Sequence, residues 1–190
     1  MKKRIILAIT GASGSLLALE FLKIMAEAEV EVHGLISDAG VKVMDIEEGI
    51  SFAELKNRAD RWFDVHDFTA PMASGSARYD GMVILPCSMG TLAAVAGGIS
   101  VNLIHRAADV TLKERRPLLL AVRETPLNRT HLRNMLTVHD AGATICPPVP
   151  SFYHHPKSLI DLATHFCSRL ADLLRVETAV DSPRWGGLDQ

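Results

Sequence analysis

The sequence of 190 residues lacks both a long apolar run and an excess of positive charge. A helix that crosses a membrane needs about 20 mostly apolar residues in succession, and no run here approaches that length. The formal net charge is −2, so the chain has no overall basic field of the kind that attracts nucleic acid. We therefore expect a protein that binds neither membranes nor nucleic acid.

Cysteine is scarce, and the histidines form no recognisable metal motif. The three cysteines, at 87, 146 and 167, are scattered and odd in number, which fits neither a disulfide framework nor a zinc spacing. His154 and His155 are adjacent and would point apart, and no H-x-x-x-H pair falls on a confident helix, so no metal is expected. Cys87 follows a strand-like run, but no base is placed beside it, and a small buried thiol is the favoured interpretation.

The composition, 48% hydrophobic and 22% charged, is that of one globular domain spanning residues 1–190 with enough residues for a sizeable core. The basic N-terminus precedes the apolar residues Ile5 to Ile9, which raises the question of a signal peptide. That run has only the length of a strand and leads directly into a glycine loop. We interpret it as the first strand and expect a cytoplasmic protein.

Strand-like apolar runs alternate with helical patterns along the chain. This alternation is typical of a parallel sheet with helices on both faces. The expected strands are residues 4–9, 31–36, 81–85, 118–122 and 143–146. The expected helices are residues 15–28, 39–48, 91–97, 103–114, 129–141 and 158–174.

The segment T-G-A-S-G-S at residues 10–15 lies between the first expected strand and helix. In this geometry backbone N–H groups and a helix N-terminus can receive a phosphate. The alternative is a tight turn in which Ser13 or Ser15 caps the helix. The segment has neither the Gly-Lys-Ser/Thr of a Walker loop nor the full G-x-G-x-x-G spacing, which favours a mononucleotide over a dinucleotide.

Three further expected strands end in polar residues. Ser37 follows the second, P-C-S-M-G-T at residues 86–91 ends the third, and Arg123-Glu124 ends the fourth. Each hydroxyl alone is more often a helix cap. The carboxyl ends of parallel strands meet at one edge of the sheet, so together these groups predict a ligand crevice there.

The segment from Arg106 to Pro126 concentrates cations around the fourth strand. Arg106 and Lys113 are seven residues apart, about two helical turns, and so fall on nearly one helix face. Such a group of cations indicates an anionic ligand, most plausibly a phosphate. Arg115 and Arg116 lie off that face and are expected to be solvated or intersubunit charges.

The segment Tyr153 to Lys157 has the Y-x-x-x-K spacing of short-chain dehydrogenases. That catalytic pair requires a helix through Pro156, which costs about 3 kcal/mol inside a helix but little at its first position. We therefore reject the dehydrogenase interpretation. The helix is expected to begin at Pro156, with Tyr153 in the preceding loop.

Taken in order, these motifs resemble the UbiX-type flavin prenyltransferases. The resemblance rests on T-G-A-S-G-S, A-S-G-S at 73–76, L-P-C-S-M-G-T-L-A at 85–93, R-A-A-D-V-T-L-K-E-R-R-P-L-L-L, R-E-T-P-L, P-P-V-P-S-F-Y and the closing R-W. It covers almost the whole chain. It implies a three-layer α/β/α doubly wound parallel sheet, flavodoxin/Rossmann-like, that assembles as a dodecamer. Members join a dimethylallyl group to N5 and C6 of reduced FMN and hand the prenylated FMN to a UbiD-type decarboxylase.

The resemblance also implies roles for individual residues. FMN would be held by Gly11, Ala12, Ser13, Ser37, Ser88, Met89, Gly90, Thr91 and Arg123. Dimethylallyl phosphate would be held by Arg106, Lys113, Tyr153 and Arg169, whose cations would stabilise the leaving phosphate without a metal. The implied catalytic residues are Ser13, Glu47, Lys113, Glu124 and Trp185, the last in a tail from about residue 176 that would complete the site. Trp185 would face an allylic cation, and Glu47, Glu124 or the released phosphate would carry protons.

Two alternatives remain open. An FMN-dependent cysteine decarboxylase of the same superfamily would carry a P-x-M-N-x-x-M-W segment and an early catalytic histidine, whereas this chain has P-P-V-P-S-F-Y at residues 147–153 and Glu47. A non-catalytic FMN carrier or accessory subunit of a decarboxylase would not need Lys113, Arg123, Tyr153 and Arg169 around one pocket.

Overall fold

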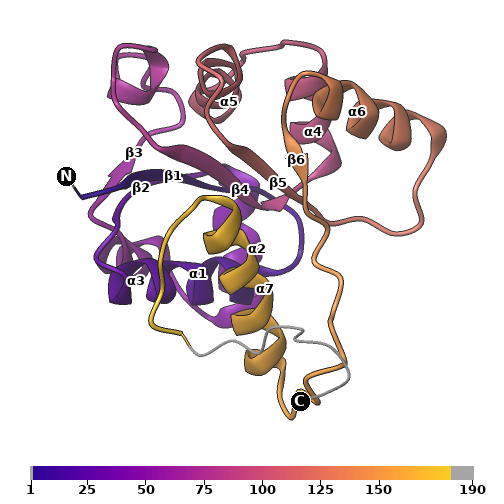
Figure 1. The fold of residues 1–190 in the computed structure, drawn as a ribbon. Helices are drawn as coiled ribbons and strands as arrows, with labels where there is room; N and C mark the ends of the chain where they lie inside the picture. The colour runs from indigo at the N-terminus through magenta and orange to yellow at the C-terminus, as the bar shows by residue number, and fades with distance from the viewer. Residues whose placement is uncertain (1, 181–190) are drawn as a thin grey trace.

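A six-stranded parallel sheet runs through the middle of the molecule (Figure 1). The computed structural model describes residues 2–180. The strands are β1 (Arg4–Ile9), β2 (Glu31–Ile36), β3 (Arg61–Phe63), β4 (Gly81–Cys87), β5 (Leu118–Val122) and β6 (Thr144–Ile145). Their order is β3-β2-β1-β4-β5-β6. The chain therefore changes direction across the sheet between β1 and β4, which is where doubly wound sheets bind ligands at their carboxyl edge.

Helices cover both faces of the sheet (Figure 1). On one side lie α1 (Ser15–Glu27), α2 (Asp38–Glu48), α3 (Phe52–Leu55) and α7 (Leu159–Leu173); on the other lie α4 (Met89–Ala96), α5 (Leu103–Lys113) and α6 (Arg129–Asp140). Two short 3-10 helices, η1 (Lys56–Arg58) and η2 (Pro71–Ala73), lie in connections. Within residues 2–180, no helix combines the length and apolar character needed to span a bilayer. The predicted three-layer α/β/α arrangement is confirmed.

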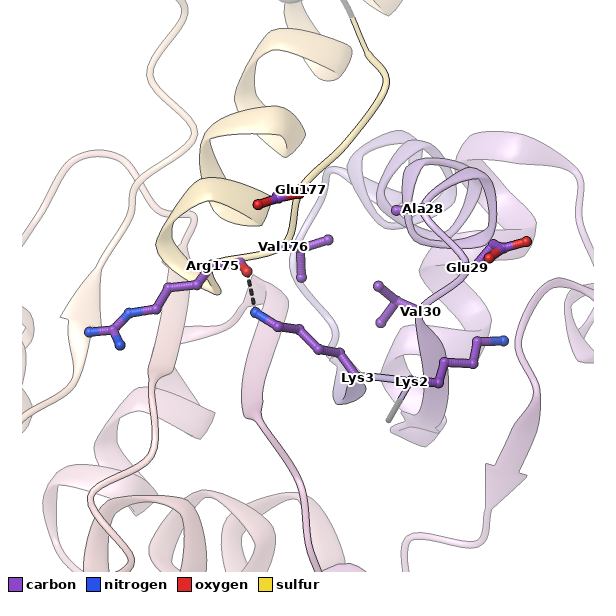
Figure 2. Close-up of a pocket in the computed structure, with 8 residues that line it drawn as sticks. All are labelled: Lys2, Lys3, Ala28, Glu29, Val30, Arg175, Val176 and Glu177. Carbon is purple, nitrogen blue, oxygen red and sulfur yellow. Dashed lines mark hydrogen bonds between the residues drawn. The ribbon is translucent and has the colours of Figure 1, made fainter.

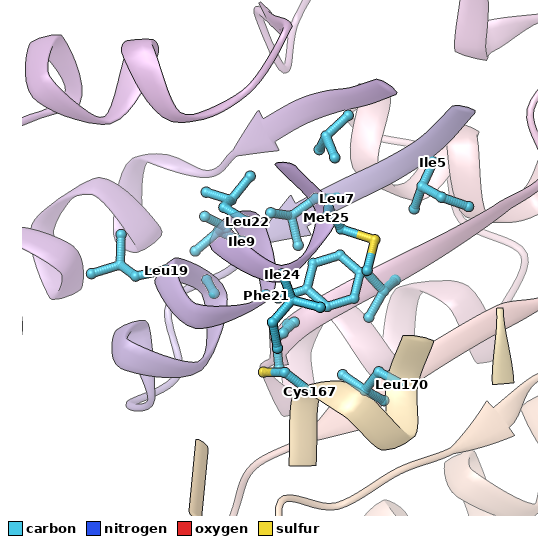
Figure 3. Packing of buried hydrophobic residues seen from close by; sticks show 14 of the residues in the cluster. Ile5, Leu7, Ile9, Leu19, Phe21, Leu22, Ile24, Met25, Cys167 and Leu170 are labelled. Carbon is cyan, nitrogen blue, oxygen red and sulfur yellow. The ribbon is translucent and has the colours of Figure 1, made fainter. Parts of the chain in front are cut away.

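The two faces of β1 belong to two separate cores. Ile5, Leu7 and Ile9 pack with Phe21 and Met25 of α1, and α7 adds Cys167 and Leu170 to the same cluster (Figure 3). Ile6 and Ala8 belong to the opposite cluster, which includes residues of α4 and α5. Both faces of the strand are buried, which explains why its sequence shows no alternation of polar residues. Each fully buried aliphatic side chain contributes about 1.5–3 kcal/mol.

Two predicted features need correction. Strand β3 was not predicted, because its three residues are too few to show a periodic pattern. In the structure the ring of Trp62 lies against Gly34 of β2, where an added Cβ would be 2.5 Å from the ring. Helix α7 begins at Leu159, within one residue of the predicted span 158–174, whereas the start expected at Pro156 is wrong. Ser158 accepts a hydrogen bond from the N–H of Asp161 (3.1 Å), and the Asp161 carboxylate accepts one from the N–H of Ser158 in return (3.1 Å). This capping box sets the start of the helix more strongly than proline does. Tyr153 lies in the preceding loop, as predicted.

Two buried histidines, His33 and His105, have pKa values lowered by their surroundings. The ring of His33 lies 2.7 Å from the Tyr79 hydroxyl through Nδ1 and 2.9 Å from the Glu31 carboxylate through Nε2. Burial lowers the pKa of His33, although Glu31 opposes that shift. Burial alone lowers the pKa of His105 on α5, whose Nδ1 has no hydrogen-bond partner within the described chain. Both rings are therefore favoured in their neutral form in the folded protein.

We predict that the free energy of unfolding falls as the pH is lowered from about 8 to about 5.5, because the unfolded histidines take up protons near pH 6.5 and the buried ones resist protonation. Urea unfolding at the two pH values measures this difference. His105→Gln should reduce the pH dependence, whereas His139→Gln at an exposed position of α6 should leave it unchanged. Equal stability of the wild type at both pH values would contradict the prediction.

Candidate functional site

The loops after β1 and β4 are joined through one threonine at the point where the sheet reverses direction. The Thr10 hydroxyl donates to the carbonyl of Pro86 (2.7 Å) and accepts from the N–H of Ser88 (2.8 Å). The Thr10 side chain is buried, so both hydrogen bonds are shielded from water. The glycine loop and the P-C-S loop therefore form a single rigid edge, as the strand-end argument predicts.

Glu47 of α2 fixes the glycine loop. Its carboxylate accepts hydrogen bonds from the N–H groups of Gly14 (2.9 Å) and Ser15 (2.8 Å). Partial burial by itself raises the pKa of Glu47, but hydrogen bonds from Ser13, Ser15 and Gly14 outweigh it and hold the pKa below its usual value. Gly14 has a φ of 120°, which favours glycine at this turn. An ionised Glu47 thus replaces the helix cap that a serine would otherwise supply.

Backbone N–H groups at this edge have no acceptor in the described chain. These are the N–H groups of Gly11, Ala12 and Ser13, and those of Met89 and Gly90 in the first turn of α4. Ser88 caps α4 by accepting from Thr91 N–H (3.3 Å) and also donates to the Thr91 hydroxyl (3.1 Å). Ser37 caps α2 by accepting from Gly40 N–H (3.0 Å). Ser37 and Ser88 therefore act as helix caps, and both directly follow strands at the carboxyl edge of the sheet.

A mostly apolar groove of about 330 Å³ adjoins the glycine loop. Ser13 and Arg123 line it together with apolar side chains that include Leu17, Leu162 and Phe166. The N–H of Arg123 donates to the carbonyl of Cys87 (3.1 Å), which joins the ends of β5 and β4. The Arg123 side chain is exposed and has no protein partner among the described residues. The groove can therefore take an apolar group while a guanidinium remains available at its margin.

Cys87 lies beneath this edge and is fully buried. Burial raises the pKa of its thiol to about 12. The thiolate is therefore a negligible fraction at neutral pH, which agrees with the interpretation of Cys87 as a packing residue.

Tyr153 and Arg169 both interact with His165. The Tyr153 hydroxyl is 3.4 Å from His165 Nε2, and the ring of His154 stacks on that of His165 at 4.4 Å. Arg169, one helical turn after His165, forms an ion pair with Asp172 at 2.7 Å. Burial, and the positive charges of His154 and Arg169, lower the pKa of His165. The structure thus brings Tyr153 and Arg169 near the same histidine, and Arg169 follows Phe166, which lines the groove, by about one turn of α7.

Arg106 and Lys113 form a third group, on α5 and beside the loop that precedes β4. Arg106 donates through Nε to the carbonyl of Ala73 (3.1 Å) and pairs with Asp109 (2.8 Å), and Lys113 pairs with Glu114. Both cations approach the loop before β4, as their shared helix face predicts. However, α5 ends shortly before β5 begins, so Lys113 lies at the amino edge, whereas Arg123 follows the carboxyl end of β5. Strand β5 separates these edges by roughly 16 Å.

Glu124, Trp185 and Arg116 are the remaining residues for which the sequence predicted a role or an environment. Glu124 is exposed and accepts a hydrogen bond from the N–H of Thr125 (2.9 Å). Trp185 lies outside the described residues. Arg116 was expected to be a solvated or intersubunit charge, and that expectation is wrong: its half-buried guanidinium donates to the carbonyls of Ala77 and Gly75, each at 2.8 Å. Sequence reasoning missed this contact because the chain turns after α5, so the periodicity of the helix no longer indicates a face.

A larger hollow of about 760 Å³ lies at the amino edge of the sheet (Figure 2). It is bordered by Lys2 and Lys3, by the turn before β2 and by the end of α7, where the Lys3 ammonium donates to the carbonyl of Arg175. Its lining includes none of the individually predicted site residues, although Val176 and Glu177 at the start of the predicted tail border it. Ligands of open parallel sheets bind at the carboxyl edge. We therefore assign the site to the groove beside Ser13 and Arg123, although that groove is smaller than the hollow at the amino edge.

Known proteins share this sequence and this geometry over nearly their full length. Residues 1–164 match the flavoprotein family. The flavin prenyltransferase UbiX of Archaeoglobus fulgidus is 44% identical over 183 residues, which cover 96% of this chain and 100% of that protein. The chain belongs to the flavin prenyltransferase family.

Solved structures of family members have the same fold. AnUbiX (PadA1), crystallised with FMN and dimethylallyl pyrophosphate, is 43% identical with a TM-score of 0.96, and the match covers 98% of this chain and 99% of that one. A dodecameric FMN-dependent UbiX-like decarboxylase from Escherichia coli O157:H7 is 39% identical with a TM-score of 0.92, covering 97% and 100%. The family resemblance inferred from the motifs is thereby confirmed.

We predict that Glu47→Ala lowers the free energy of unfolding by about 1–3 kcal/mol, since it leaves the N–H groups of Gly14 and Ser15 without their charged acceptor. Urea unfolding near pH 7 measures this change. Glu48→Ala on the same helix should change stability by less than about 0.5 kcal/mol. An equal effect of the two substitutions would show that Glu47 does not support the loop.

Proposed function

We propose that this protein joins a dimethylallyl group, taken from dimethylallyl phosphate, to N5 and C6 of reduced FMN. The prenylated FMN would then pass to a UbiD-type decarboxylase. The observation that carries this proposal is the match, over nearly the whole chain, to a relative whose structure contains FMN and dimethylallyl pyrophosphate. Contacts within this chain support the proposal for each molecule in turn.

FMN fits the carboxyl edge between β1 and β4. Backbone N–H groups of Gly11, Ala12, Ser13, Met89 and Gly90 lack protein acceptors in the described chain, and such groups bind the phosphate and polar edges of nucleotides. Ser37, Ser88 and Thr91 add hydroxyls, and Arg123 adds a cation. An added Cβ on Gly90 would meet nothing within 4 Å, which leaves room for a ligand against the start of α4. Reduced FMN supplies the electron-rich N5 and C6 atoms of the reaction.

The protein's own groups would drive the departure of phosphate. Breaking the carbon–oxygen bond leaves an allylic cation and an anionic phosphate, and Arg106, Lys113 and Arg169 would stabilise the anion. Tyr153 would donate a hydrogen bond to it. Glu47, Glu124 and Ser13 are the candidate proton carriers for closing the second bond at C6. The apolar side chains of the groove exclude water from the reactive cation.

These groups can meet only if subunits share a site. Lys113 lies at the amino edge, roughly 16 Å along β5 from the level of Arg123, so one chain does not bring both to the same phosphate. Because a relative with 39% identity is dodecameric, we infer that a neighbouring subunit presents Arg106 and Lys113 to the carboxyl edge. The whole chain would form one cytoplasmic domain, with the tail from about residue 176 completing the site.

Product analysis separates this proposal from the two alternatives. Incubated without oxygen with reduced FMN and dimethylallyl monophosphate or diphosphate, the wild type should yield a flavin whose mass has increased by C5H8. Mass spectrometry of the extracted flavin detects it. An unmodified flavin with both donors would reject the prenyltransferase, and carbon dioxide release from a cysteine peptide would instead support the related decarboxylase.

Lys113→Ala should abolish turnover while FMN binding stays within about twofold, since the lost charge acts on the phosphate. Arg169→Ala should also be inactive. When the two variants are co-expressed and assemble together, about a quarter of the sites should combine intact groups from different subunits and regain activity. Mixing the separately purified variants without dissociation provides the control. No recovery after co-expression would place both residues in one chain's site.

A further inference from the structure

We propose that Arg116 is a positioning residue for the prenyl phosphate site, which it serves by holding the loop at residues 73–77 against which Lys113 lies. The inference rests on the proposed function, because Lys113 matters through the leaving phosphate. It assigns a task to a residue outside the motif positions that contact either substrate.

Arg116 holds the 73–77 loop through two carbonyl groups. Its Nη1 donates to Ala77 and its Nη2 to Gly75, both at 2.8 Å. Arg106 adds a third hydrogen bond, from Nε to the Ala73 carbonyl at 3.1 Å. The carbonyls of alternate loop residues thus accept from two guanidinium groups. A planar guanidinium can reach two carbonyls at once, which a lysine ammonium at the end of a flexible chain does not reproduce.

The loop in turn limits the position of the Lys113 ammonium. A Cβ added to Gly75 would be 2.6 Å from Lys113 Nζ, and the Glu114 carboxylate would be closer still. The ammonium therefore lies directly against the main chain of Gly75, whose carbonyl accepts a hydrogen bond from Arg116. A shift of Gly75 would move the surface on which the charge of Lys113 rests.

The turn after α5 brings Arg116 back to this loop. Arg115 has a φ of 54°, and the N–H groups of Arg115 and Arg116 donate to the carbonyls of Leu112 and Thr111, each at 2.9 Å. This left-handed turn lets Lys113 and Arg116, three residues apart, contact the same five-residue loop. Arg115, between them, is exposed and forms no side-chain hydrogen bond in the described chain, so it is a matched control.

The test compares Arg116→Lys with Arg115→Lys in the full-length protein. We expect Arg116→Lys to lower kcat/KM for dimethylallyl monophosphate about tenfold or more, mainly through KM, while the Kd for FMN and the oligomeric state stay unchanged. Arg115→Lys should match the wild type. Gly75→Ala keeps Arg116 but displaces the Lys113 ammonium, so it should reproduce the defect, and the double variant should lose less than the product of the two single losses.

The results of this comparison separate a failure of the positioning role from a failure of the proposed function. If the wild type forms prenylated flavin but Arg116→Lys keeps its kcat/KM, the positioning role is wrong and the proposed function stands. The role is also wrong if FMN binding or assembly falls in proportion to activity, because Arg116 then supports the fold as a whole. If the wild type forms no prenylated flavin, the proposed function and the positioning role fail together.

Discussion

The buried hydroxyl of Thr10 is the contact on which the site at the carboxyl edge depends. It donates to the end of β4 and accepts from the N–H that begins the next loop. A buried hydrogen-bond pair of this kind contributes about 1–3 kcal/mol, because breaking it leaves polar groups shielded from water. Since Thr10 also begins the glycine loop, the two loops that border the groove keep a fixed spacing. Glu47 then fixes the far side of the same loop from α2.

The direction of the helices explains why the cations are divided. In a parallel sheet each connecting helix runs opposite to the strands, so a residue late in α5 must lie at the amino edge. The amphipathic pattern that places Arg106 and Lys113 on one face therefore also carries Lys113 away from the carboxyl edge. Under the proposed function this conflict requires subunits that share a site, because another copy could bring the end of α5 to the carboxyl edge of this one.

The sequence predicted those parts of the structure that depend on local pattern. The bounds of β1, β2 and β5 agree with the predicted runs, and all three strands are buried except for the half-buried first residues of β1 and β2. Strand β5 is apolar throughout and β1 is apolar after Arg4, whereas β2 also contains Glu31 and His33. Strand β3 escaped prediction because its identity depends on a partner strand and on the Trp62 and Gly34 contact, which are distant in sequence. The start of a helix at Pro156 and the role of Arg116 were predicted wrongly, although the pattern for residues 158–174 located α7 itself. At α7, the side-chain cap at Ser158 sets the start of the helix in place of Pro156. At Arg116, the left-handed turn at Arg115 has already ended the helical periodicity.

The ion pairs of the predicted phosphate-binding cations are compatible with the binding and release of phosphate that the proposed function requires. Arg106, Lys113 and Arg169 each pair with a carboxylate one or three residues away, and each side chain remains at least 35% exposed. Exposed pairs of this kind contribute only about 0–1 kcal/mol. Under the proposed function, a phosphate with two negative charges would displace the carboxylates at small cost, and the carboxylates would recover the cations when phosphate leaves. The local acidic partners would also limit repulsion between these cations where subunits bring them together without phosphate.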